Sequence, residues 1–421
     1  MRTFHSFIPP PILCCAGVHH GMRARQTQNA EASACAEGNG PGPSTAHCMH
    51  PPRPRPRQFR EATEPQQPHP PPAPAPGSAA PTPDTAALEV DVDPPADEPK
   101  APTEDATSMD VGYAYASNVD SHRLVVVDVC DVKDLLDSDP IDFDAINVIY
   151  TDGKNSVKDD GVRTIAGFAT GEDKKHGLSD FYGTPAPLDE FVSSAIAGTG
   201  VFEGASDDVR SQGVEKGIQN QIMIAWVVHE LNTAIAKGQD GNFDVAKGAV
   251  HNWDEGWAFY AGAEPGCGPY GTADKRGENF GTLTDGGTSV SNEAILAAMI
   301  SGRDALLASN LAGAEVAAAN VVKNVAITYS QAVIRYATKI IDDMAADDSD
   351  AAAKHAAEGL AFWRVIEAYV VPAGADGETI NAIFALDGDY GSDGGADEVR
   401  NALQPALDAL GITDADIGTL S

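Results

Sequence analysis

The sequence predicts a mainly α-helical protein: a helical bundle built from two duplicated helical-hairpin halves, with a minor β component at its N-terminal edge. The six residues Glu255–Tyr260 (Glu-Gly-Trp-Ala-Phe-Tyr) return 103 positions later as Glu358–Trp363 (Glu-Gly-Leu-Ala-Phe-Trp). Each copy follows a long stretch of apolar residues at helical spacing, at 213–237 and at about 314–346. Two hairpins related by duplication favour a helical bundle.

The elements follow in chain order. Leu124–Val127 and Ile146–Tyr150 have the composition of short strands or buried segments and, as strands, form the expected β component, followed by a turn-rich loop at 151–156. The rest is predicted to be helical at 213–237 (ending at Gly238), 244–262, 289–309 (capped by Ser291), 314–346 and 351–371 (stopped by Pro372), with a Gly-rich connection over 262–288.

The N-terminal quarter of the chain has a different composition. Of the 29 prolines, 22 lie in residues 1–102, and proline runs are typical of extended backbone without a core. We expect residues 1–108 to be a Pro-rich disordered region, whose first residues make a poor secretory leader because three prolines interrupt the apolar stretch. Residues 109–412 are expected to form the helical domain, with halves 109–285 and 286–412, and 413–421 a tail.

The net charge limits the partners. The first hundred residues carry −2, so residues 101–421 carry −32 of the total of −34. This charge argues against nucleic acid and anionic membrane surfaces as partners. No stretch reaches the roughly 18 apolar residues of a membrane span. Cys130 and Cys267 are the cysteines of the folded part, and a disulfide and two unpaired thiols fit equally well.

The histidines that precede the two copies suggest chemistry. His251 lies four positions before Glu255 and His355 lies three before Glu358, so each pair shares one helix face. Imidazole and carboxylate from paired helices are typical of metal sites in bundles. His229 and Glu230 would come from a third helix, and Tyr260 would offer a phenolate of the kind that hard ferric iron prefers.

A simpler interpretation competes with the metal site. Aromatic residues at helical spacing usually form a core, and both glutamates would then pair with Arg276, Arg335 or Arg364. His229-Glu230 begins a zinc-protease motif, but Thr233 stands where its second histidine is needed. No local signature of a Ser/His/Asp or Cys/His nucleophile is present.

Several segments together resemble the iron-assimilating periplasmic proteins of green algae, also described as low-iron-inducible or high-CO2-inducible periplasmic proteins, to which marine phytotransferrins look related. The resemblance covers roughly residues 112–412. The segments are Tyr150–Ser156, Arg163–Thr170, Gly217–Gln221, Trp226–Glu230 and His251–Tyr260.

The resemblance implies a secreted or periplasmic, non-catalytic protein that binds Fe(III) before it is taken up by ferric uptake machinery at the cell surface. It also implies carbonate as a co-bound anion, for which Arg276, Arg364 and Lys154 are candidate partners. Two alternatives stay open. A carboxylate-bridged di-iron oxidase needs four carboxylates and two histidines, usually in the order Glu-x-x-His, which these turns reverse. An acidic surface protein would bind cations loosely and without preference for iron.

Overall fold

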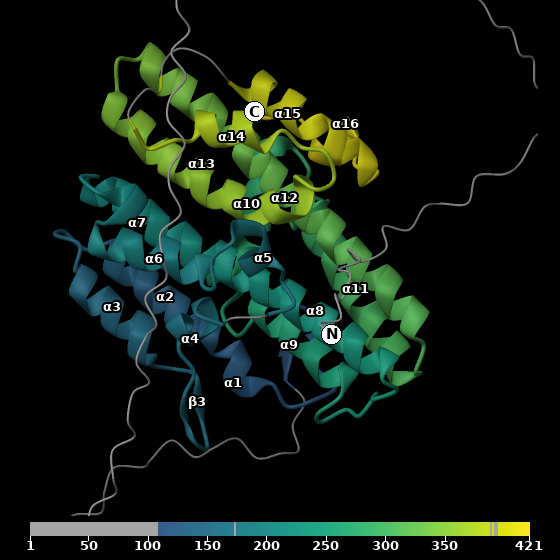
Figure 1. The fold of residues 1–421 in the computed structure, drawn as a ribbon. Helices are drawn as coiled ribbons and strands as arrows, with labels where there is room; N and C mark the ends of the chain where they lie inside the picture. Colours follow the sequence, from purple (N-terminus) through teal and green to yellow (C-terminus); the bar gives the residue numbers. More distant parts are fainter. Residues whose placement is uncertain (1–107, 172–173, 388–389, 391–394) are drawn as a thin grey trace, which may run out of the picture. The chain divides into compact units, whose positions relative to one another are not determined.

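The computed structural model describes residues 108–171, 174–387, 390 and 395–421, which belong to one compact unit. The expected disordered region, apart from Ser108, lies outside the described residues. Helices dominate what is described, and the predicted mainly α-helical class is confirmed (Figure 1). The β component consists of two small antiparallel hairpins, in which Met109 pairs with Ala114 and Val157 with Val162.

The first part of the unit contains β1 (Met109–Asp110), β2 (Tyr113–Ala114), α1 (Asp120–Arg123), α2 (Val125–Leu136), α3 (Phe143–Asp152), β3 (Val157–Lys158), β4 (Gly161–Val162), α4 (Ile165–Ala169), α5 (Leu178–Tyr182), α6 (Pro187–Ala197), the 3-10 helix η1 (Gly200–Phe202) and α7 (Asp207–Lys216). The second part contains the π-helix η2 (Gly217–Ile222), α8 (Met223–Gln239), α9 (Ala249–Tyr260), the 3-10 helix η3 (Pro265–Cys267), α10 (Pro269–Phe280), α11 (Val290–Leu307), α12 (Leu311–Ala345), α13 (Ser349–Val370), α14 (Gly377–Ile383), α15 (Ala396–Ala409) and α16 (Asp414–Ile417).

The two predicted strands are wrong, because both segments are helical. Leu124–Val127 enters α2, where the buried side chains of Val125, Val129 and Val132 share one helical face. Ile146–Tyr150 lies in α3, which begins at Asp142, whose side chain accepts a hydrogen bond from the Ala145 N–H at 2.9 Å. Short apolar runs fit a buried helix as well as a strand.

The long helices lie where the sequence predicts them, as η2 with α8, and as α9, α11, α12 and α13. Their ends differ in detail. Ser289, not Ser291, caps α11 by accepting from the Asn292 N–H, and Gly238 lies inside α8. The connection 262–288 contains α10, which starts at Pro269 in the first helical turn. Residues 413–421 contain α16, and Ile417 is buried.

The helices pair as two hairpins. α8 packs against α9, and α12 packs against α13, while α11 lies against both α12 and α9 (Figure 1). Each copy of the repeated turn therefore lies on the second helix of a hairpin, although the duplication itself stays a prediction. The aromatic residues of the copies are core, as the simpler interpretation predicts: Trp257, Phe259, Phe362 and Trp363 are buried.

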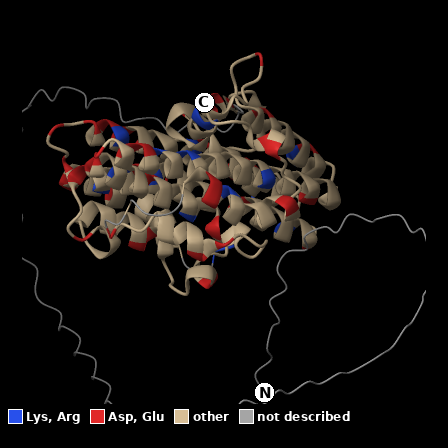
Figure 2. Cartoon of the chain, turned by 90° about the horizontal axis from the view of Figure 1, so that it is seen from above, with Lys and Arg blue, Asp and Glu red and all other residues tan. Residues whose placement is uncertain are grey.

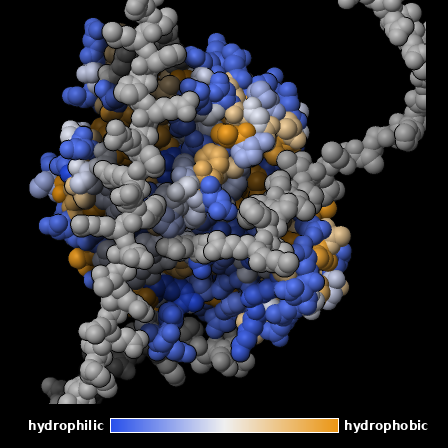
Figure 3. All heavy atoms as spheres, in the orientation of Figure 1, coloured by the Kyte–Doolittle hydropathy of each residue, from blue (hydrophilic) through white to orange (hydrophobic). Residues whose placement is uncertain are grey.

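Acidic residues spread over the outer helices and loops, with fewer basic residues between them (Figure 2). The face seen in Figure 3 is mostly hydrophilic, with small hydrophobic areas. Among the described residues, no helix is both long and apolar enough to cross a membrane.

Close packing at Gly302 leads to a first prediction. A Cβ atom there would lie 1.9 Å from Cζ2 of the fully buried Trp253, whose indole N–H donates to the Met299 carbonyl at 2.8 Å and holds the ring in place. We expect Gly302→Ala to lower the free energy of unfolding by about 2 kcal/mol, because the ring cannot move without losing packing or this bond. Urea unfolding followed by circular dichroism measures it.

Gly256 provides the matched control, because it is also a buried glycine inside a helix. Its added Cβ would meet Leu231 Cδ2 at 3.6 Å, an ordinary contact. Gly256→Ala should therefore leave stability unchanged or raise it by up to about 1 kcal/mol through helix propensity. Equal losses in both variants would contradict the packing argument.

Candidate metal centre

Two glutamates, two histidines and an asparagine meet where α1, α8 and α9 pack together; we call His122, Glu230, His251, Asn252 and Glu255 the His–Glu cluster. Glu255 Oε1 lies 3.2 Å from His122 Nδ1 and 3.1 Å from His251 Nε2. The Asn252 amide donates to Glu255 Oε2 at 3.0 Å and also to Glu230. Glu230 is 4% and Glu255 7% exposed, so the carboxylates are largely removed from water.

Three helices supply these side chains. His251 and Glu255 lie one turn apart on α9, as their spacing predicts. The packing of α8 on α9 brings Glu230 alongside, and the short helix α1, which packs on α9, brings His122. Sequence reasoning missed His122, because no local pattern ties it to a helix more than a hundred residues away.

A chain of hydrogen bonds orients His251. Ser117 Oγ donates to Asp254 Oδ2 at 2.8 Å and lies 3.1 Å from His251 Nδ1. Since the Ser117 proton is used on Asp254, His251 Nδ1–H is the donor to Ser117, and Nε2 is the ring nitrogen that faces Glu255. Such an outer partner on the second nitrogen is typical of metal-binding histidines. His251 Nε2 and Glu255 Oε1 lie 3.1 Å apart, so a cation, either a proton or a metal ion, must lie between them.

The two glutamates differ in acidity. Burial and the negative charge of Glu255 raise the pKa of Glu230 well above its usual range. Burial also acts against ionisation of Glu255, but its contacts with His251 and His122 hold the pKa of Glu255 below its usual range. Burial lowers the pKa of His122 to about 4, so its imidazole is neutral near pH 7, and its Nδ1 faces Glu255 as an N–H donor.

Arg163 is a second residue that sequence reasoning missed as part of the site, although it begins one of the segments quoted for the resemblance. It follows β4, is half-buried, and its Nη1 is buried without a hydrogen-bond partner. Burial lowers the pKa of Arg163, while the negative charge of Glu255 acts in the opposite direction. A cationic donor with an unused N–H thus lies within electrostatic reach of the His–Glu cluster.

His229 lies beside the cluster rather than in it. Its Nε2 is 3.9 Å from Glu230 Oε1, and its Nδ1 accepts a hydrogen bond from the Lys175 N–H at 2.9 Å. In the neutral ring the proton is therefore on Nε2, which faces Glu230 as a donor. Burial lowers the pKa of His229 to about 4.

The second copy of the turn forms a different group. His355 pairs with Asp343 on α12, and its ring lies 5.8 Å from that of Tyr336. Glu358 is buried beside the Tyr336 hydroxyl, where burial and the charge of Glu358 raise the pKa of the phenol. The positive charge of Arg276 acts in the opposite direction and lowers the pKa of the same phenol. The two copies of the repeated turn therefore have different neighbouring side chains.

The remaining predicted site residues lie elsewhere. Tyr260 is buried, and its hydroxyl donates to Asn292 Oδ1 at 2.7 Å. Arg364 Cζ lies 4.3 Å from the centre of the Tyr182 ring, and exposed Lys154 pairs with Asp131 at 3.0 Å. The expected pairing of Glu255 with an arginine is replaced by the two histidines.

The cluster is closed by its own hydrogen bonds. Within the part of the chain that the structure describes, no group of three or more His, Cys, Asp or Glu side chains is arranged so that it could hold a metal ion as it stands. Two donors bound at right angles to one ion at about 2.1 Å lie about 3 Å apart, close to the separations around Glu255 Oε1. A metal ion would replace the protons that now hold the donors together.

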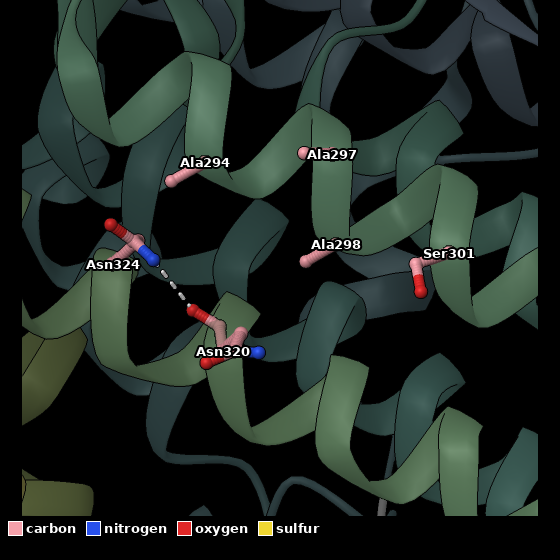
Figure 4. A pocket seen from close by; sticks show the side chains of 6 residues that line it. All are labelled: Ala294, Ala297, Ala298, Ser301, Asn320 and Asn324. Carbon is pink, nitrogen blue, oxygen red and sulfur yellow. Dashed lines mark hydrogen bonds between the residues drawn. The ribbon is translucent and has the colours of Figure 1, made fainter.

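A hollow of about 330 Å³ lies between α11 and α12 but does not coincide with the cluster (Figure 4). Its walls are alanines with one serine and two asparagines, and Asn324 donates to the Asn320 carbonyl at 2.8 Å. No titratable side chain lines it, so it offers no ligands for a metal.

The family described as low iron-inducible periplasmic protein matches residues 100–421, which include every element described above. No curated protein and no solved structure matches the chain.

Proposed function

Because the chain belongs to the low iron-inducible periplasmic protein family, we propose that it binds ferric iron at the His–Glu cluster, without catalysis, and delivers it for assimilation. The observation that carries the proposal is the convergence of His122 Nδ1 and His251 Nε2 on one oxygen of buried Glu255, at 3.2 and 3.1 Å. The location of the family fits a protein that meets iron outside the plasma membrane and passes it to surface uptake machinery.

The donor set suits a hard, highly charged cation. Glu230 and Glu255 supply carboxylates, and His122 and His251 supply neutral imidazoles, a combination that ferric iron accepts. The buried Asn252 Oδ1 has no hydrogen-bond partner and adds an unused oxygen at the same place. Bound metal would also relieve the repulsion between the two carboxylates.

The charges leave room for an anion. Two ionised glutamates neutralise two of the three positive charges of Fe(III), so a co-bound anion would complete the balance. We assign this anion to the Nη1 of Arg163, a donor that has no hydrogen-bond partner. Carbonate is the anion that the resemblance implies. Arg163 thus takes the place of Arg276, Arg364 and Lys154 in this proposal.

The ligand set is smaller than the sequence suggested. Glu230, His251 and Glu255 stay in it, and His122 joins it. An oxidase is not favoured, because the class needs four carboxylates around two irons and the cluster contains two.

Glu255→Gln tests the proposal. Glutamine keeps the shape but removes the charge that both histidines face, so we expect the ferric affinity to fall at least about 100-fold, the loss of one charged ligand. Ferric citrate is titrated into the iron-free protein with bicarbonate present, and bound iron is measured after desalting. Leaving out bicarbonate should weaken binding to the wild type but change little in Arg163→Gln.

Glu358→Gln is the matched control, since it removes a buried glutamate from the corresponding position of the second copy. It should bind iron like the wild type. Unchanged affinity in Glu255→Gln, or an equal loss in both variants, would exclude the His–Glu cluster as the iron site.

A further inference from the structure

Arg276 on α10 carries a buried positive charge. Its side chain is 6% exposed, and its Nε and Nη1 have no hydrogen-bond partner. Among the described residues, no carboxylate forms an ion pair with it. A guanidinium stays protonated in proteins, and a buried charge without a partner is strongly unfavourable. Unpaired N–H donors on a buried guanidinium suit an anionic acceptor.

The neighbours of Arg276 also offer unused donors. Its guanidinium carbon lies 5.6 Å from the centre of the Tyr336 ring and 5.9 Å from that of Phe362. Its charge also acts on the phenol of Tyr329, whose hydroxyl donates to Asn220 Oδ1 at 2.9 Å. The amide Nδ2 of Asn220, in the π-helix, is buried and unpartnered. The unused atoms of Arg276 and Asn220 are all N–H donors, so the missing partner is an acceptor.

Three lysines, on α2, α7 and α10, lie close enough for their charges to act on one another. Glu215 lies 3.4 Å from Lys133 Nζ and 2.7 Å from Lys216 Nζ, and Lys133 also reaches Gln219 of the π-helix at 3.3 Å. Lys275 precedes Arg276 in the chain. Burial, together with the charges of Lys133, Lys216 and Arg276, lowers the pKa of Lys275, which shows that these cations act on one another.

This concentration of positive charge stands out in residues 101–421, which carry −32. Lys133, Lys216, Lys275 and Arg276 contribute four cations, and the carboxylates of Glu215 and Glu358 offset two of them, which leaves +2. The side chains of Lys133 and Lys216 are 21% and 16% exposed, whereas Arg276 is buried. Solvent therefore reaches this group of cations at the lysines and not at Arg276.

We propose that Arg276 and the three lysines form a binding site for a doubly charged tetrahedral oxyanion of the phosphate or sulfate class, separate from the His–Glu cluster. The oxyanion enters past Lys133, Lys216 and Lys275 and accepts hydrogen bonds from Nε and Nη1 of Arg276. Its two negative charges match the local excess of +2. The site goes beyond the proposed iron binding, because it does not require iron.

Calorimetric titration of the iron-free, full-length protein with sodium phosphate and with sodium sulfate tests the site, at constant ionic strength set with sodium chloride. We expect saturable binding of one oxyanion per chain. Arg276→Gln and Lys216→Gln should each weaken it at least about tenfold, the usual worth of a charged hydrogen bond. Phosphate binding with no sulfate binding would show that the site needs the anion's own proton as a donor, and equal binding would show that charge suffices.

Lys154→Gln is the control for lost charge, because Lys154 pairs with one carboxylate, as Lys216 does. It should bind oxyanion like the wild type. If Arg276→Gln fails to fold, the partly exposed Lys216 still decides the matter. No saturable binding at millimolar oxyanion, or an equal loss in Lys154→Gln, would overturn the proposal. Ferric affinity should be unchanged in Lys216→Gln, so failure of this site and failure of the iron site are distinguishable.

Discussion

Asp254→Ala is expected to lower the free energy of unfolding by about 4 kcal/mol. The Asp254 side chain is fully buried and accepts four hydrogen bonds: from the Tyr113 hydroxyl at 2.7 Å, the Ala116 N–H at 2.9 Å, and the N–H and hydroxyl of Ser117 at 2.7 and 2.8 Å. Alanine leaves four donors without an acceptor, and each buried unpaired donor costs about 1–3 kcal/mol. Water entering the cavity recovers part of this loss.

The same change should weaken ferric binding. Ser117 holds His251 Nδ1 at 3.1 Å only while Asp254 fixes the Ser117 hydroxyl. Without Asp254, the imidazole loses the partner that sets its tautomer and orientation, a change that typically costs about 10–100-fold in metal affinity. Asp254 is therefore a positioning residue for the proposed site. Urea unfolding of the iron-free protein and ferric titration of the folded variant measure the two effects.

Asp189→Ala is the comparison. Asp189 also accepts a hydrogen bond from a tyrosine, Tyr150, at 2.7 Å, but this is a single, partly exposed contact outside the His–Glu cluster. It should cost about 1–2 kcal/mol and leave ferric affinity unchanged. If Asp254→Ala unfolds at the same urea concentration as the wild type, or binds iron equally well once folded, the positioning role is wrong.

Whether the sequence could predict an element of the fold depended on the length of that element. The helices at 213–237 and 314–346 extend over several turns, so their apolar spacing identifies them. The run Val125–Val127 contains β-branched residues that favour strands, and only its packing on the core selects the helix α2. Three such residues carry too little periodicity to decide between a strand and a helix.

The candidate site shows the same limit. The pair His251 and Glu255 could be predicted because one turn of α9 sets their separation. Tyr260 could have been excluded, since five residues at about 100° each turn it about 140° away from Glu255. His122 and Arg163 could not be found, because they reach α9 through tertiary packing of distant segments.

The second copy of the turn shows why repetition did not predict function. Its glycine and its last two aromatic positions match the first copy, while Leu360 stands where the first copy has Trp257, and the aromatic residues are buried in both. The facing helices differ: α8 presents Glu230 to Glu255, whereas α12 presents Tyr336 to Glu358. A local repeat preserves the helix face but does not fix what lies opposite it. We therefore expect iron at the first turn alone.

Removing the disulfide should have the largest effect on stability. The structure pairs Cys130 of α2 with Cys267 of η3, which answers the question that the sequence left open. The bond joins positions 137 residues apart, so it restricts the unfolded chain strongly, and chain-entropy reasoning gives a loss of about 5 kcal/mol for the reduced protein. We expect Cys130→Ala/Cys267→Ala to unfold at a much lower urea concentration than the wild type.

Reductant provides the control, because four further cysteines, Cys14, Cys15, Cys35 and Cys48, lie outside the described residues. Dithiothreitol should destabilise the wild type as much as the double substitution does, and should not destabilise the double variant further. A variant with the wild-type urea midpoint would contradict the expectation. The bond fastens α2, which carries Lys133, to the segment that leads from α9 into α10 and Arg276. Loss of the disulfide should therefore weaken oxyanion binding more than ferric binding. The His–Glu cluster depends on α1, α8 and α9 instead.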